Sequence, residues 1–134
     1  MISKSAVNEL KDRFPGANIV ALPPDEPREV IAEVEPTEEH PEYSVAVALI
    51  ERSKAHHHNR STETYRVLGG SMMLFVGDEV VPLAEGQTYV IKPGILHSVI
   101  VKPPLKPALV EVTSEPGWSQ DDHILEEFKP DPKA

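Results

Sequence analysis

The segments HHHNRSTETYRVLGG, residues 56–70, and GQTYVIKPGILHSV, residues 86–99, decide the predicted fold of this chain. His56 and His58 are two residues apart, so on a β-strand their side chains leave the same face. Glu63 follows after a four-residue gap, which is long enough for a loop and a return onto a neighbouring strand. His97 follows a Pro-Gly turn, where a new strand can begin. Three imidazoles and one carboxylate that converge on one point would bind a divalent transition metal.

The predicted ligand set favours chemistry over a purely structural role. Four nitrogen and oxygen ligands leave about two positions open on a six-coordinate ion, whereas structural zinc is four-coordinate and closed. Histidine and carboxylate suit Mn, Fe, Co, Ni or Zn, and the choice among these metals stays open. By strand parity His57 points away from its two neighbours and is not a ligand. His40 and His123 have no partner nearby in sequence and are predicted to be surface residues.

The rest of the chain is punctuated by short segments of strand character. A helix is predicted over residues 5–14, where the apolar residues share one face and Pro-Gly follows. A second helix is predicted over residues 119–128 and a flexible tail over 129–134, and Trp118 is expected to close one end of the fold. Alternation or valine content predicts strands at residues 18–22, 28–34, 43–50, 63–68, 71–76, 79–83, 88–91, 97–101 and 109–113. Many short strands at this spacing predict an antiparallel sandwich or barrel.

The two quoted segments resemble the paired motifs of the cupin superfamily. The first motif of the family runs H-x-H, three or four residues, E, six residues, G, and His56, His58, Glu63 and Gly70 fit it. In the second motif, Gly86, Gly94 and His97 fit in register, and 15 residues separate Gly70 from Gly86, as in small microbial cupins. Three other positions depart from the family pattern, and they leave the subfamily and the reaction open: Gln87, Lys92 and Val101.

The resemblance implies an all-β fold, a double-stranded β-helix or jelly-roll barrel with short terminal helices. It implies one cupin domain over residues 1–134, with the barrel at about 28–115, and metal ligation by His56, His58, Glu63 and His97. Glu63 is also a candidate proton acceptor. Tyr65 shares its strand parity and is a candidate to contact substrate, with a plain core position as the alternative.

Three functions are compatible with this resemblance. The first is isomerase or lyase chemistry on a small polar or sugar-like substrate, which the C-terminal run EPGWSQDDHILEE favours because it resembles the ends of cupins related to sugar-phosphate isomerases. The second is iron-dependent dioxygenation, which no residue specifically favours. The third is a non-enzymatic module that binds a metal or a small ligand.

The composition of the chain limits which binding partners and which cellular location are predicted. The formal net charge is −9 and no basic cluster stands out, which argues against nucleic acid or anionic membranes as partners. The chain has no cysteine, so disulfides and thiolate ligands are excluded, which fits a reducing cytosol. The first residues lack the uninterrupted apolar centre of a signal peptide, and a cytoplasmic location is predicted. No apolar run approaches the ~20 residues that span a bilayer. Strand-like residues 28–34 exceed what one small barrel needs, which predicts a homodimer.

Overall fold

The segments predicted as strands all form β-strands in the computed structural model, which describes residues 1–126. Each predicted strand matches an observed one to within two residues, and the N-terminal helix is displaced by one residue. The elements, in chain order, are α1 (Lys4–Arg13), β1 (Asn18–Leu22), β2 (Glu29–Glu35), β3 (Ser44–Ile50), β4 (His56–His57), β5 (Thr62–Gly69), β6 (Ser71–Val76), β7 (Glu79–Ala84), β8 (Thr88–Ile91), β9 (His97–Ile100), β10 (Ala108–Glu115), the 3-10 turn η1 (Gln120–Asp122) and β11 (Ile124–Leu125).

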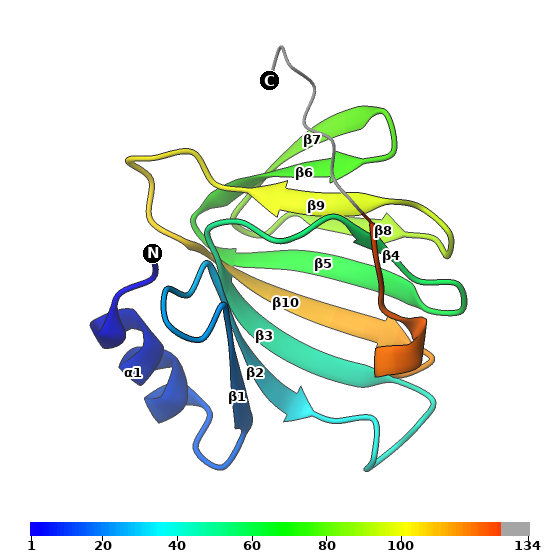
Figure 1. The fold of residues 1–134 in the computed structure, drawn as a ribbon, viewed down its shortest axis with the longest axis horizontal. Coiled ribbons are helices and arrows are strands. Elements are labelled where there is room, and N and C mark those ends of the chain that lie inside the picture. Colours follow the sequence, from blue (N-terminus) through cyan, green and yellow to red (C-terminus); the bar gives the residue numbers. More distant parts are fainter. Residues whose placement is uncertain (127–134) are drawn as a thin grey trace.

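The strands form two antiparallel sheets (Figure 1). One sheet has the strand order β1-β2-β3-β10-β5-β8, and the other has the order β11-β4-β9-β6-β7. Neighbours such as β3 and β10 are far apart in sequence, as the crossing connections of a jelly roll require. The main hydrophobic core takes residues from both sheets, with Val67 and Val110 from the first and Leu74 and Val99 from the second. The predicted all-β jelly-roll fold is therefore confirmed.

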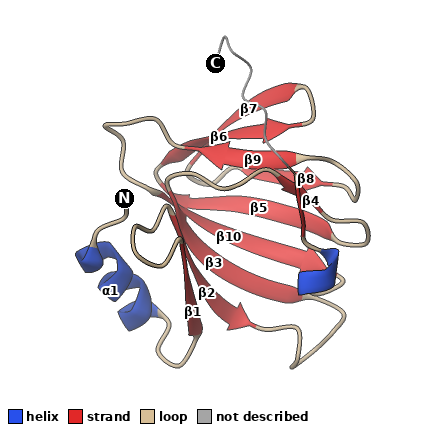
Figure 2. Ribbon diagram, in the orientation of Figure 1, coloured by secondary structure: helices blue, strands red, loops and turns tan. Residues whose placement is uncertain are grey.

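A second apolar cluster covers the outer face of the six-stranded sheet. Helix α1 lies beside β1 and β2 (Figure 2), and its buried Leu10 packs with Val30 and Ala32 of β2. Ser3 caps this helix, since its side chain accepts a hydrogen bond from the backbone N–H of Ala6 at 3.1 Å. Because Val30 and Ala32 face the helix, the alternate residue Glu29 faces the inner side of the sheet.

The strand β2 finds both of its partners within its own chain. It pairs with β1 on one side and with β3 on the other, so residues 28–34 are not left over for a second subunit. The sequence argument for a homodimer is therefore wrong in its premise. The dimer itself stays a prediction, and β1 is now the edge strand that could take part in it.

The helix predicted over residues 119–128 is wrong within the described part of the chain. A single 3-10 turn occupies Gln120–Asp122, and Ile124–Leu125 form a strand that pairs with His57 and His56. Backbone pairing with β4 overrides the weak helical pattern of this segment. The remaining predicted helical residues and the tail at 129–134 lie outside the described residues. Among the helices that are described, none has the length and apolarity needed to cross a bilayer.

Gly70 links β5 to β6 with a backbone that favours glycine. Its φ is +77°, whereas the preceding Gly69 has no positive φ. An added Cβ at Gly70 would lie 3.6 Å from Cα of Ala108, which is an ordinary van der Waals contact. Any loss of stability on substitution by alanine would therefore come from the backbone angle alone. We expect Gly70→Ala to lower the free energy of unfolding by about 1–2 kcal/mol, measured by urea denaturation. Gly69→Ala is the matched control and should have little effect; equal losses would contradict the backbone argument.

Candidate metal centre

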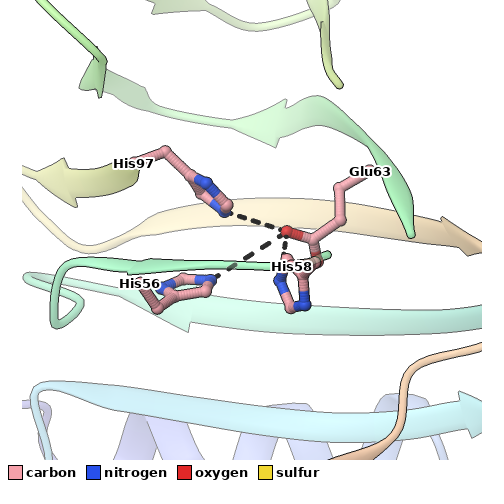
Figure 3. Close-up of side chains that lie close together, drawn as sticks. All are labelled: His56, His58, Glu63 and His97. Atoms are coloured by element: carbon pink, nitrogen blue, oxygen red, sulfur yellow. Dashed lines mark hydrogen bonds and ion pairs between the residues drawn. The ribbon is translucent and has the colours of Figure 1, made fainter. Parts of the chain in front are cut away.

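Four side chains from three neighbouring regions of the two sheets point toward one another (Figure 3). Strand β4 and the loop after it supply His56 and His58, β5 supplies Glu63, and the start of β9 supplies His97. Each offers one ligand atom, these atoms lie within 4.8 Å of one another, and all four residues are buried. The structure thus brings together the ligand set predicted from the sequence.

The imidazole Nε2 atoms surround a single carboxylate oxygen, Oε1 of Glu63. The Nε2 atoms of His58 and His97 are each 2.9 Å from this oxygen, and that of His56 is 3.9 Å from it. The second carboxylate oxygen accepts a hydrogen bond from the hydroxyl of Ser114 at 3.4 Å. The donor atoms therefore point inward toward the space that one ion would share.

The other ring nitrogen of each histidine is held by the main chain. In all three cases Nδ1 contacts a backbone carbonyl oxygen, which fixes Nδ1 as the protonated nitrogen and leaves Nε2 free as a donor to a metal. These acceptors are Lys54 for His56 at 2.9 Å, Asp122 for His58 at 3.0 Å and Ile95 for His97 at 2.9 Å. Such outer contacts are typical of metal-binding histidines.

One buried atom in the cluster lacks a hydrogen-bond partner. Nε2 of His58 is 2.9 Å from Oε1 of Glu63 but makes no hydrogen bond with it. Among the described residues, this nitrogen is the one buried side-chain nitrogen or oxygen atom that has no hydrogen-bond partner. An unpaired buried polar atom costs free energy, and a cation would remove that cost. The residues present therefore fit a divalent metal ion.

Burial and neighbouring charges shift the pKa values of the ligand residues when no metal is bound. Burial first, and then the charge of His97, lower the pKa of His56 to about 3. Burial opposes the shift at Glu63, but the neighbouring imidazoles of His58 and His97 hold the pKa of this carboxyl well below its usual range. Burial also opposes the shift at His58, where the carboxylate of Glu63 raises the pKa. The carboxylate is thus kept ionised, as ligation requires.

The C-terminal strap, residues 118–126, lies along the ligand-bearing loop. The carboxylate of Asp122 accepts hydrogen bonds from the backbone N–H groups of Asn59, Arg60 and Ser61, at 2.9 to 3.1 Å to the nearer oxygen of each. Asp122 is buried, and its main-chain carbonyl also accepts the contact from His58. This aspartate therefore supports the ligand loop.

His123 belongs to the same cluster, so its prediction as a surface histidine is wrong. Its ring centroid is 4.4 Å from that of His56 and 5.4 Å from that of His58. The indole N–H of Trp118 donates to its Nδ1 at 3.3 Å. Burial is the main cause that lowers the pKa of His123. Its presence beside the ligands depends on the pairing of β11 with β4, which no spacing in the sequence reveals.

His57 faces away from the four ligand residues, as strand parity predicts. Its Nδ1 is 2.7 Å from a carboxylate oxygen of Glu126 in the strap, and it is not part of the converging group. Arg60, which lies between the ligands in sequence, pairs with Asp121 at 3.1 Å. Both contacts tie the strap to the loop without entering the site.

Comparison with known proteins agrees with this geometry. Residues 45–108 match the family model described as a cupin domain. The chain carries a cupin domain. No curated protein matches it in sequence.

Solved cupin structures share the fold at low sequence identity. A Streptomyces Pac13 variant with uridine has a TM-score of 0.71 at 15% identity, covering 86% of this chain and 88% of that chain. KdgF from a Halomonas species has a TM-score of 0.63 at 20% identity, covering 78% and 91%. Oxalate decarboxylase from Bacillus subtilis has a TM-score of 0.69 at 17% identity, covering 84% of this chain but only 30% of that chain. The fold is shared with all three.

Two further ionisable groups of the cupin barrel face its interior. Tyr65 is buried on β5 two residues beyond Glu63, and its ring centroid is 5.9 Å from that of His97. Burial first, and then the charges of Glu63 and Glu29, raise the pKa of Tyr65 well above its ordinary value. Burial and the charge of Glu63 raise the pKa of Glu29 to about 7. Tyr65 was among the candidate residues named from the sequence, whereas Glu29 was not. The alternation of β2 is the signal that could have predicted that Glu29 faces the interior.

The raised pKa of Glu29 makes stability depend on pH in a definite direction. The carboxyl of Glu29 has a pKa of 4.5 in the unfolded chain and about 7 in the folded protein. The free energy of unfolding therefore falls as the pH rises from the first value through the second. We expect Glu29→Gln to raise the free energy of unfolding at pH 8 by about 1–2 kcal/mol, allowing for partial exposure. The variant should match the parent at pH 4.5. Denaturant unfolding of chelator-treated protein measures this, and a gain that is equal at both pH values would contradict it.

Proposed function

We propose that this cupin binds one divalent transition metal ion, Mn, Fe, Co, Ni or Zn, through His56, His58, Glu63 and His97, and acts as an isomerase or lyase on a small polar or sugar-like molecule. The observation that carries the proposal is the convergence of three Nε2 atoms and one carboxylate oxygen, with Nδ1 of every histidine held by a carbonyl. A non-enzymatic binding module would use the same ligands, and it is the competing outcome of the test below.

The bound ion would supply Lewis acidity that polarises a carbonyl or hydroxyl oxygen of the substrate. The raised pKa keeps the hydroxyl of Tyr65 protonated, so we assign it a role as hydrogen-bond donor to the substrate. Glu63 remains ionised and is assigned as a ligand. Its second role, as proton acceptor, requires the carboxylate to leave the ion transiently.

The named reactions of two structural relatives support elimination chemistry. Pac13 is described as a nucleoside dehydratase, and the Bacillus subtilis protein is an oxalate decarboxylase. The first reaction removes water and the second removes carbon dioxide, and both are lyase reactions. This support favours the lyase form of the proposal over iron-dependent dioxygenation.

Metal analysis followed by two assays tests the proposal. Protein purified without chelator or nickel resin is expected to contain close to one equivalent of a transition metal. The metal-loaded protein should accelerate solvent-proton exchange or elimination in a panel of hydroxylated and keto-acid substrates, with no consumption of oxygen. Glu63→Gln should lose both metal and activity. Oxygen consumption would identify a dioxygenase, and tight binding without turnover would identify a binding module.

We also propose that the protein forms a cytoplasmic homodimer. In this arrangement β1, the edge strand of the six-stranded sheet, would pair with a second copy, and half-exposed Leu22 lies on that edge. Sedimentation at micromolar concentration tests the dimer, and a purely monomeric protein would contradict it.

A further inference from the structure

His123 lies beside the ligand histidines without being one of the four converging donors. The ligand group consists of the three histidines and Glu63, although the ring of His123 is only 4.4 Å from that of His56. His123 is partly exposed, whereas the four ligand residues are buried. Among these neighbouring imidazoles, that of His123 is therefore the one that solvent reaches most.

The contact with Trp118 fixes which nitrogen of His123 carries the proton. The indole N–H can only donate, so Nδ1 of His123 must accept and is unprotonated. In the neutral ring the proton is then on Nε2, which faces away from the indole. Within residues 1–126, the contact from Trp118 is the only side-chain hydrogen bond that His123 makes, and Nε2 is not a buried atom. An N–H donor is thus available beside the site.

The strap holds this donor in position from both sides. The preceding residue, Asp122, is fixed by three backbone N–H groups, and the following strand, β11, pairs with the strand of His56. A donor on such a framework is pre-organised, so a ligand that accepts its hydrogen bond pays little ordering entropy.

The charge of the site selects the kind of molecule that would accept this hydrogen bond. A divalent ion with Glu63 as its single carboxylate ligand has a net charge of +1, because the three imidazoles are neutral when they ligate. The carboxylate of Asp122 is directed at the backbone of the loop, and that of Asp121 pairs with Arg60. No described carboxylate other than Glu63 is among the converging donors. A small organic anion therefore fits the site better than a cation.

We propose that His123 is a substrate-binding residue, which donates its Nε2–H to an oxygen of a small carboxylate-bearing substrate held at the metal centre. The partly exposed Trp118, at 39% of its full accessible area, fixes the tautomer, and its ring centroid is 5.7 Å from that of His123. This inference rests on the proposed metal centre and deepens it by naming the substrate class.

Oxalate binding to the cobalt-loaded protein tests the inference without an activity assay. Co²⁺ affinity is measured by chelator competition, and oxalate affinity by the change in the visible Co²⁺ spectrum, with cobalt content checked after gel filtration. His123→Phe keeps the ring but removes the donor, and we expect oxalate affinity to fall about 10-fold or more, with Co²⁺ affinity unchanged. His123→Gln, whose amide nitrogen can occupy the place of Nε2, should retain most of the oxalate affinity.

The control variant and the remaining outcomes separate this inference from the metal proposal. His57→Phe removes a neighbouring histidine outside the site and should leave both affinities unchanged. Equal oxalate affinity in the parent and His123→Phe overturns the inference alone, as does a parent protein that binds Co²⁺ but no oxalate. A loss of Co²⁺ affinity in His123→Phe also overturns it, because His123 would then be a ligand. Failure of the parent protein to bind Co²⁺ overturns the metal proposal and the inference together.

Discussion

Substitution of His58 by glutamine is expected to lower the affinity of the protein for Zn²⁺ or Co²⁺ by more than ~100-fold. Loss of an outer contact to a metal ligand costs about 10–100-fold in affinity, and loss of the ligand itself costs more. His58 is the residue whose Nε2 is buried without a hydrogen bond, so the metal is the partner that this nitrogen lacks. Competition with a coloured chelator measures the affinity.

The adjacent residue provides a matched control for this substitution. His57→Gln changes the same residue type one position away, but His57 contacts Glu126 at the surface and not the site. We expect its metal affinity to equal that of the parent protein. Comparable losses in the two variants would mean that the histidine run binds metal without the geometry described, and no loss in either would exclude His58 as a ligand.

Metal-dependent stability gives a second measurement of the same substitution. A ligand present at 100 times its dissociation constant stabilises the folded protein by about 2.7 kcal/mol. The parent protein and His57→Gln should therefore melt at a higher temperature when metal is added. His58→Gln should show almost none of this increase at the same metal concentration.

The sequence predicted the parts of the site that depend on local geometry. Strand parity separates His56 and His58 from His57, because successive side chains on a strand leave opposite faces. The turn at Gly94 starts the strand that carries His97, and its φ of +84° is the conformation that the motif requires. Alternation or valine content likewise predicted β1 to β3 and β5 to β10, since half-buried strands need that pattern, but it did not predict the two-residue strands β4 and β11.

The parts that the sequence did not predict depend on contacts between distant segments. Asp122 lies 64 positions beyond His58, and nothing in the spacing shows that its carbonyl accepts from that imidazole. Ile124 and Leu125 fit a helical stripe, yet they pair with β4 because the open edge of that strand offers hydrogen bonds. The available signal was the run Asp121-Asp122-His123 after Trp118, which placed charged and metal-binding residue types next to each other.

Substitution of Asp122 by alanine is expected to lower both the stability of the protein and its affinity for metal, because the strap would no longer support the ligand loop. This change removes the acceptor of three backbone N–H groups at the loop that carries His58. Buried donors left without an acceptor are costly, so we expect the free energy of unfolding to fall by about 2–4 kcal/mol. Metal affinity should also fall, by about 10–100-fold, because the loop no longer holds His58 in place.

Asp121→Ala is the matched control, since the neighbouring carboxylate is exposed and pairs with the guanidinium of Arg60, which also donates a hydrogen bond to the hydroxyl of Ser119. Its effect on stability and on metal affinity should be small. Urea denaturation and chelator competition on both variants make the comparison. If Asp121→Ala and Asp122→Ala behave alike, the strap does not support the site through the buried carboxylate.

The pH dependence of the Asp122 effect distinguishes the charged hydrogen bonds from simple loss of packing. Burial acts to raise the pKa of Asp122, but the N–H donors of Asn59, Ser61 and Arg60 bring it below the ordinary value of 3.8. The stabilisation by the carboxylate is therefore present above that value and is lost as the pH falls through the lower folded-state pKa. The difference between the parent protein and Asp122→Ala should shrink in acid, whereas a packing defect would cost the same free energy at every pH at which the protein folds.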